Sequence, residues 1–390
     1  MNTSLKKSSE LKHISKISKD GDPLAFLEDL LPFRIYQKSF IIKTLALAQV
    51  IYVLILGGLF IREFDSIESD IRLLKNYNCL SSFGLASAMI TVQFSIWCNT
   101  VAEFPTKVRE MGCNLTCAGF SLYQSILKEC KIIKITIYAN LGMSLLTSIS
   151  FMPFIGDEAH FNLPEFLVEK YNPYGKGFIR VVNYSFIPLF GYTLLVPLFF
   201  CTHYVSHIKF QIMLLNGFLK KINEEGSILD GRYQKIVSKK LKLCVQLHNR
   251  IKRILEEVMV INNPLGILMI FVSTLLFVSA AYFIISNIST RSNFRMYLVL
   301  LAWSLIAVTF CTTAQRLTDQ SEEVFLNAYN CPWVCWNKEN RRTLVMLLAN
   351  SLKPMNVTIY ITETNHTLLL KLWRLGHATL TCLANVNKKK

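Results

Sequence analysis

The sequence predicts an all-α membrane protein with seven transmembrane helices, because of its composition and the grouping of its apolar residues. Of the 390 residues, 52% are hydrophobic and only 17% are charged, whereas about 25% of the residues in a soluble domain are charged. The mean hydropathy of the whole chain is +0.35. Since every backbone polar group in lipid needs a partner within its own element, the long apolar runs are predicted to be helices.

Six apolar runs reach the length of about 20 residues that crosses the hydrocarbon core. In chain order they cover 39–61, 79–101, 135–155, 184–205, 262–287 and 296–315. A seventh segment, 366–386, is apolar except for Lys371, Arg374 and His377. Because a central Lys or Arg costs roughly 2.5–3.5 kcal/mol in a lipid-facing helix, Lys371 and Arg374 are expected to face water, a carbonyl group or a partner subunit.

The basic residues predict which ends of the helices face the cytoplasm. With the amino terminus inside, the cytoplasmic segments carry 27 Lys and Arg and the outer segments carry 11, and such an excess is typical of the cytoplasmic side. Seven crossings then put the carboxyl terminus outside, the inverse of a G-protein-coupled receptor. The loop bias also explains the formal net charge of +16, so no nucleic acid partner is expected.

The spans divide the chain into six segments. They are a cytoplasmic amino-terminal segment, 1–38; spans one to four, 39–205; a cytoplasmic helical stalk, 206–261; spans five and six, 262–315; cytoplasmic anchor helices, 316–365; and the last helix with a short outer tail, 366–390.

The stalk carries an apolar seam of coiled-coil-like spacing, with alternating steps of four and three residues. Its members are Val237, Leu241, Cys244, His248, Ile251, Leu255 and Val258. Two interpretations are open and compatible. The seam packs within the chain, or Leu241, His248, Ile251 and Leu255 form a subunit interface in which His248 sets the register.

Other signals do not predict catalytic or metal chemistry. His203 and His207 have a spacing that can hold a metal, but the sequence shows no third ligand, so no metal is expected. Two Cys-x3-Cys pairs in cytoplasmic segments are expected to be free thiols: Cys113 with Cys117, and Cys331 with Cys335. Without a Gly-rich phosphate loop or a nucleophile with a base, neither an enzyme nor a cofactor is predicted.

Three groups of residues occur in a fixed order along the chain. They are Leu243-Cys244-Val245 with His248 before the fifth span; Cys311, Leu317, Ser321, Ala328, Tyr329 and Trp333 in and after the sixth; and Arg341-Arg342, Leu344 and Pro354 before the last helix. With these motifs and the inverted topology, the chain resembles the insect odorant receptor family over nearly its full length. Its short fourth-to-fifth loop is similar to that of an odorant-tuned subunit, because the shared co-receptor carries a long insertion there.

The resemblance implies an odorant-binding subunit of a ligand-gated, non-selective cation channel. Its implied location is the plasma membrane of a sensory-neuron dendrite, where membrane lipid surrounds it. The implied partners are a small volatile ligand and the odorant receptor co-receptor, in a hetero-oligomer that is expected to be a tetramer. The last helix would line a central pore, and no second messenger would be required for opening.

The resemblance also implies where the ligand and the gate lie. The odorant pocket would lie among the outer halves of the second, third, fourth and sixth spans, with an aromatic wall and with Thr147 or a Tyr hydroxyl as the hydrogen-bonding group. The candidate ligand-binding residues are Phe83, Met143, Thr147, Phe151, Phe190, Tyr282, Tyr297 and Trp303. Leu375, Thr379, Cys382 and Val386 share one helix face, and the family places Cys382 and Val386 where the pore narrows; an apolar ring there can close a channel by dewetting.

Two other functions are alternatives. A gustatory receptor of the same superfamily shares the inverted topology, but its typical Thr-Tyr motif and Gln-Phe pair are missing from the last helix of this chain. A secondary transporter is a more distant alternative, in which Lys371 and Arg374 would bind a substrate anion.

Overall fold

The computed structural model describes residues 22–31, 39–66, 71–154, 156, 162–171, 176–223, 230–285, 290–360 and 362–388. Within them the chain is almost entirely helical. The helices are α2 (Ala25–Leu30), α4 (Phe40–Ser66), α5 (Ile71–Met111), η2 (Leu115–Ala118), α6 (Phe120–Ser150), α7 (Leu163–Tyr171), α8 (Lys176–Asn223), α9 (Gly231–Ile285), α10 (Thr290–Tyr329), η5 (Trp333–Cys335), α11 (Lys338–Ser351) and α12 (His366–Lys388). A two-residue hairpin, β1 (Thr358–Ile359) with β2 (Thr362–Glu363), is antiparallel and precedes α12.

The six strongly apolar runs are confirmed as helices. Each coincides with one helix that is long and apolar enough to cross a membrane, namely α4, α5, α6, α8, α9 and α10. The first run begins one residue before α4, residues 286–287 of the fifth lie outside the described residues, and the third differs at its end. That span is predicted to reach residue 155, but α6 ends at Ser150 and Phe151 caps it. The seventh segment also forms a helix, α12, with the basic residues exposed on it.

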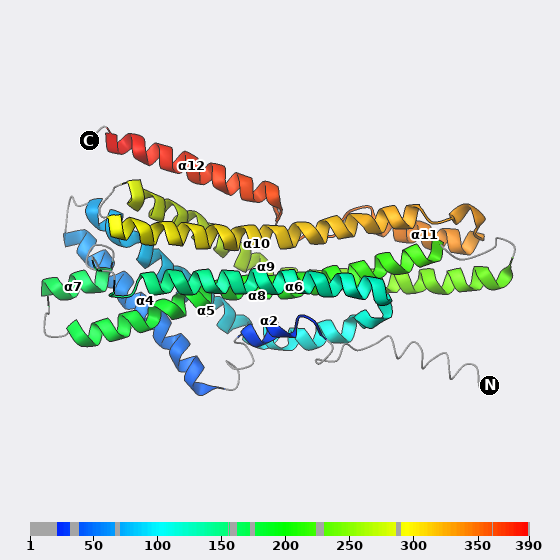
Figure 1. Ribbon diagram of the computed structural model, residues 1–390, viewed down its shortest axis with the longest axis horizontal. Helices are drawn as coiled ribbons and strands as arrows, with labels where there is room; N and C mark the ends of the chain where they lie inside the picture. The colour runs from blue at the N-terminus through cyan, green and yellow to red at the C-terminus, as the bar shows by residue number, and fades with distance from the viewer. Residues whose placement is uncertain are drawn as a thin grey trace.

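The long helices exceed the thickness of a bilayer. At about 1.5 Å per residue, the 55 residues of α9 extend roughly 80 Å, against a hydrocarbon core of about 30 Å. Figure 1 shows the helices running along the long axis of the molecule, with α11 at one end and α7 and the carboxyl terminus at the other. The predicted stalk and anchor segments are therefore mostly helical continuations of the spans.

Helix α8 is the centre of the bundle. Every residue from Thr193 to Asn216 is buried, and α8 contacts α5, α6, α9 and α10. A helix buried all round has neighbours on every side. The polar residues in this stretch must therefore find partners inside the protein, which explains the two polar sites on α8 described below. Helix α4, by contrast, is mostly exposed, as expected for a lipid-facing helix.

Candidate functional site

The apolar seam of the stalk packs within the chain. Leu241, His248, Ile251 and Leu255 are all buried on α9, which contacts α11 and α10 there. At the same end Asn340 of α11 donates from Nδ2 to the backbone oxygen of Gln234 at 2.9 Å. The intramolecular interpretation is confirmed, and the subunit interface stays a prediction.

Two cavities lie away from the predicted odorant residues. One of about 600 Å³ lies between α9 and the segment after α11, where His248, Leu255 and Lys353 are part of its wall. The other, of about 400 Å³, lies between α4 and α5 beside Lys43. None of the eight predicted ligand-binding residues lines either cavity among the described residues.

Two of the predicted residues, Phe83 and Phe190, belong to one aromatic cluster between α4, α5 and α8. The Phe190 ring is stacked with the Tyr52 ring, with centroids 6.4 Å apart, and with the Phe186 ring, with centroids 6.1 Å apart. The Tyr52 hydroxyl donates to Oδ1 of Asn183 at 2.6 Å. The sequence analysis missed Tyr52 and Phe186; Phe186 is one helical turn before Phe190, and that spacing on one face was the available signal.

Phe151 lies in a second apolar cluster at the same end of the bundle, together with Tyr184, Phe283 and Met296. Arg295 closes this end. It is fully buried, and its guanidinium donates from Nε to the Ser150 oxygen at 2.7 Å and from Nη2 to the Gly156 oxygen at 2.8 Å. Arg295 thus donates to a carbonyl group in the last turn of α6, which has no partner within its own helix. From the sequence, Arg295 was counted only as a basic residue of an outer loop.

Two contacts fix how α6 and α10 face each other. Arg295 reaches Ser150 near one end, and the Asn140 Nδ2 donates to the Thr309 hydroxyl at 3.0 Å further along. The two contacts show that α6 and α10 are antiparallel, because Ser150 lies beside Arg295 and Asn140 lies beside Thr309. Met143 and Thr147 of α6 and Trp303 of α10 therefore lie between these two contacts along the helices. The Thr147 hydroxyl already donates to the Met143 oxygen at 2.8 Å. It is therefore not a spare donor for a ligand.

Trp303 and Tyr297, both predicted to bind the ligand, differ in exposure. Trp303 is 6% exposed and Tyr297 is 57% exposed. A step of six residues turns by about 240° around a helix, so the two side chains point in different directions. The buried indole Nε1 of Trp303 has no hydrogen-bond acceptor among the described residues. Tyr282 is partly buried on α9.

The predicted pore face of α12 points away from the chain's own helices. Leu375 is 52% exposed and Cys382 is exposed, with Thr379 partly buried; the side chain of Val386 lies outside the described residues. Gly376, about 100° around the helix from Leu375, packs on α9, where an added Cβ would lie 2.6 Å from Phe277 Cδ1. Lys371 and Arg374 are exposed, as expected if they face water or a partner.

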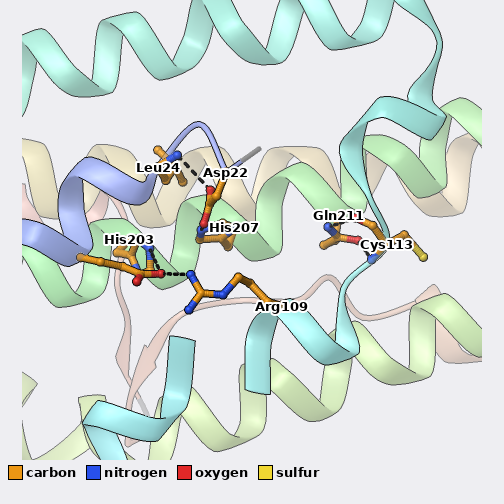
Figure 2. Close-up of polar contacts among 8 residues, drawn as sticks. Asp22, Leu24, Arg109, Cys113, His203, His207 and Gln211 are labelled. Atoms are coloured by element: carbon orange, nitrogen blue, oxygen red, sulfur yellow. Dashed lines mark hydrogen bonds and ion pairs between the residues drawn. The ribbon is translucent and has the colours of Figure 1, made fainter. Parts of the chain in front are cut away.

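A polar stripe on α8 holds the amino-terminal segment and the α5–α6 connection (Figure 2). Gln211 accepts from the Cys113 N–H at 2.8 Å and donates to the Cys113 oxygen at 2.9 Å. One and two turns earlier, His207 and His203 face Asp22, whose Oδ2 lies 3.2 Å from His207 Nε2. Asp22 is the third group that the sequence analysis did not find, because it is 181 residues before His203 in the chain.

The carboxylates beside these histidines come from the segment around α2. Burial by itself would raise the pKa of the Asp22 carboxyl, but His207 and the Leu24 N–H lower that pKa to about 2. Glu28 Oε1 accepts from Arg109 Nη1 at 2.5 Å and lies 4.0 Å from His203 Nε2. The four cysteines of the two Cys-x3-Cys pairs are free thiols, as predicted, and the other seven are free as well.

Comparisons with known proteins agree with the motifs and with this architecture. A family model described as 7tm Odorant receptor matches residues 120–375, more than half of the chain. Odorant receptor 46a, isoform B, of Drosophila melanogaster is 23% identical over 163 residues, which are 39% of this chain. The chain therefore matches only 40% of the length of this curated relative.

The solved structure of the insect olfactory receptor OR5 from Machilis hrabei has a similar fold. The TM-score is 0.67 at 18% sequence identity, over 90% of this chain and 91% of OR5. The structure of that receptor in complex with eugenol has the same TM-score and coverage at 17% identity. The resemblance drawn from the motifs is thus confirmed, and the extent of the family match shows that this protein belongs to the seven-transmembrane odorant receptor family.

Proposed function

We propose that this protein is the odorant-binding subunit of a ligand-gated, non-selective cation channel. Membership of the odorant receptor family is the observation that carries the proposal, and the likeness to a receptor solved with eugenol supports it. In this proposal the amino terminus is cytoplasmic, the chain lies in the plasma membrane of a sensory-neuron dendrite, and the co-receptor completes the channel.

The exposed face of α12 supports a role at the pore. Leu375 is an apolar side chain that stays 52% exposed, although α12 contacts α9 and α10 of its own chain. Such a side chain needs an apolar environment that a single subunit does not supply. In an assembly, Leu375, Thr379 and Cys382 would line the central passage with their counterparts. Their separation would then admit hydrated cations.

The indole of Trp303 is the group that we assign to ligand recognition. Odorants are small and mostly apolar, so their site needs an apolar wall with few polar groups. A buried N–H without an acceptor among the described residues is costly, and an odorant carbonyl or ether oxygen would satisfy it. Met143 and Thr147, at neighbouring levels on α6, would contribute the wall.

The function is tested by expressing the chain with an odorant receptor co-receptor and recording whole-cell current. A broad panel of volatiles is expected to include compounds that evoke a cation current within milliseconds, with G proteins blocked. Uptake of a ligand without current would indicate a transporter, and current without the co-receptor would contradict the hetero-oligomer. An epitope ahead of Met1 is expected to label only permeabilised cells; labelling of intact cells would contradict the orientation.

The recognition group is tested with Trp303→Phe, and Tyr329→Phe, at an exposed aromatic residue near the other end of the same helix, is the matched control. Losing one hydrogen bond is worth about 0.5–1.5 kcal/mol, so Trp303→Phe is expected to raise the half-maximal concentration of a carbonyl odorant roughly 2- to 12-fold. The response to a hydrocarbon of similar size should change little. Equal shifts of the half-maximal concentration for the carbonyl odorant and the hydrocarbon would show that Trp303 Nε1 does not recognise the ligand.

A further inference from the structure

The buried group of Asp22, His203 and His207 has the composition of a metal site. One oxygen or ring nitrogen of each residue lies within 4.8 Å of those of the other two, and all three side chains are buried. The two histidines are one turn apart on α8, and the carboxylate comes from the segment before α2. We propose that these three side chains bind a zinc ion, which joins the amino-terminal segment to the central helix.

His203 provides an independent observation that points to a ligand. Its side chain is fully buried, and neither ring nitrogen has a hydrogen-bond partner among the described residues. A buried nitrogen without a partner costs free energy. Because the ring of His203 lies 4.7 Å from that of His207, centroid to centroid, a metal ion between these rings would be the partner that the protein does not supply.

Asp22 is oriented as a ligand would be. Its Oδ1 accepts from the Leu24 N–H at 3.0 Å, which leaves Oδ2 facing His207 at 3.2 Å. A hydrogen bond that holds one atom of a ligating side chain so that the other faces the metal is typical of metal sites. Glu28 neutralises Arg109 beside the group, so the remaining charge is the negative charge of Asp22, which favours a cation.

The ligand types favour zinc over the other divalent ions. Two imidazoles and one carboxylate suit Zn²⁺, whereas Ca²⁺ and Mg²⁺ require mainly oxygen ligands. Tetrahedral ligands at about 2.0–2.2 Å from zinc lie roughly 3.4 Å apart. The ligand atoms, now up to 4.8 Å apart, must therefore approach one another by up to about 1.4 Å. A water molecule or Glu28 Oε1, 4.0 Å from His203 Nε2, would take the fourth position.

The full-length chain, purified in detergent, is the material for the test. It is incubated with Zn²⁺, desalted and assayed for bound metal by mass spectrometry, and Co²⁺ is used as a spectroscopic substitute. We expect one zinc per chain and the intense visible absorption of tetrahedral cobalt with nitrogen ligands. A chain without retained zinc, or with only the weak absorption of octahedral cobalt, would overturn the proposal.

Variants separate this site from metal bound elsewhere. Asp22→Asn keeps an oxygen for the Leu24 N–H and removes the anionic ligand, and it is expected to weaken zinc binding at least tenfold. His203→Gln with His207→Gln should abolish binding, and His248→Gln, at a buried histidine of α9, should leave it unchanged. Equal zinc in all variants would mean an adventitious ion only. Should the double variant fail to elute as a folded protein, Asp22→Asn decides the question.

Discussion

Replacing Gly376 with alanine is expected to destabilise the contact between α12 and α9. The added Cβ would lie 2.6 Å from both Cδ1 and Cε1 of Phe277, whereas ordinary carbon contacts are about 3.5–4.0 Å. The helices must separate by about 1 Å, or the Phe277 ring must leave its place. Overpacking of this kind costs about 1–3 kcal/mol.

The expected cost can be converted into a melting temperature. With about 2.1 cal/mol/K of unfolding entropy per residue, 390 residues give about 0.8 kcal/mol/K, so Gly376→Ala should lower the melting temperature by roughly 1–4 °C. The assay is fluorescence-detected size-exclusion chromatography after heating. Gly142→Ala is the matched control, because nothing lies within 4 Å of a Cβ at that position.

A second substitution tests the reasoning directly. Phe277→Leu removes the ring that the new Cβ would meet, so the double variant should recover at least half of the loss. If α12 borders the pore, Gly376→Ala should also change the current without odorant, and Gly142→Ala should not. A wild-type melting temperature for Gly376→Ala, or no recovery by Phe277→Leu, would refute the packing of α12 on α9.

Three further outcomes are expected. A charged methanethiosulfonate reagent should block odorant-evoked current by modifying Cys382, the exposed one of the eleven cysteines, and Cys382→Ser should abolish the block; an unchanged block would place the reactive thiol elsewhere. Asn340→Ala should cost about 0.5–1.5 kcal/mol, seen as a lower melting temperature, because it removes the 2.9 Å hydrogen bond from the fully buried Asn340 amide to the Gln234 backbone oxygen; no shift would contradict that pairing. Arg109→Met should cost about 3–5 kcal/mol, since it leaves the Glu28 carboxylate, 3% exposed, without its cation, and adding Glu28→Gln should recover part of the loss; no recovery would contradict the ion pair.

The candidate site was predictable where a residue's role depends on its own helix. The seam from Val237 to Val258 was visible as a spacing of three and four residues, and its members are buried. The exposed face of Leu375 and Cys382 was likewise visible on α12. The different exposures of Tyr297 and Trp303 were not predictable in this way, because membership of the same span says nothing about the side of the helix on which a residue lies.

Residues whose partners are distant in the chain were not predictable. Arg295 was counted as an outer loop charge, yet it is buried against the end of α6. The polar pair of Tyr52 and Asn183 joins residues 131 positions apart. Such pairings depend on which helix faces which, and hydropathy within one segment does not contain that information.

The sequence by itself determined the class of protein, the six strongest spans and the family, because apolar runs of bilayer length and ordered motifs are properties of contiguous residues. Only the tertiary structure decided that α8 is buried on all sides and that Asp22 meets His203 and His207 on it. Burial of a helix is set by its neighbours, and the need to satisfy polar groups inside that helix then selects partners from anywhere along the chain.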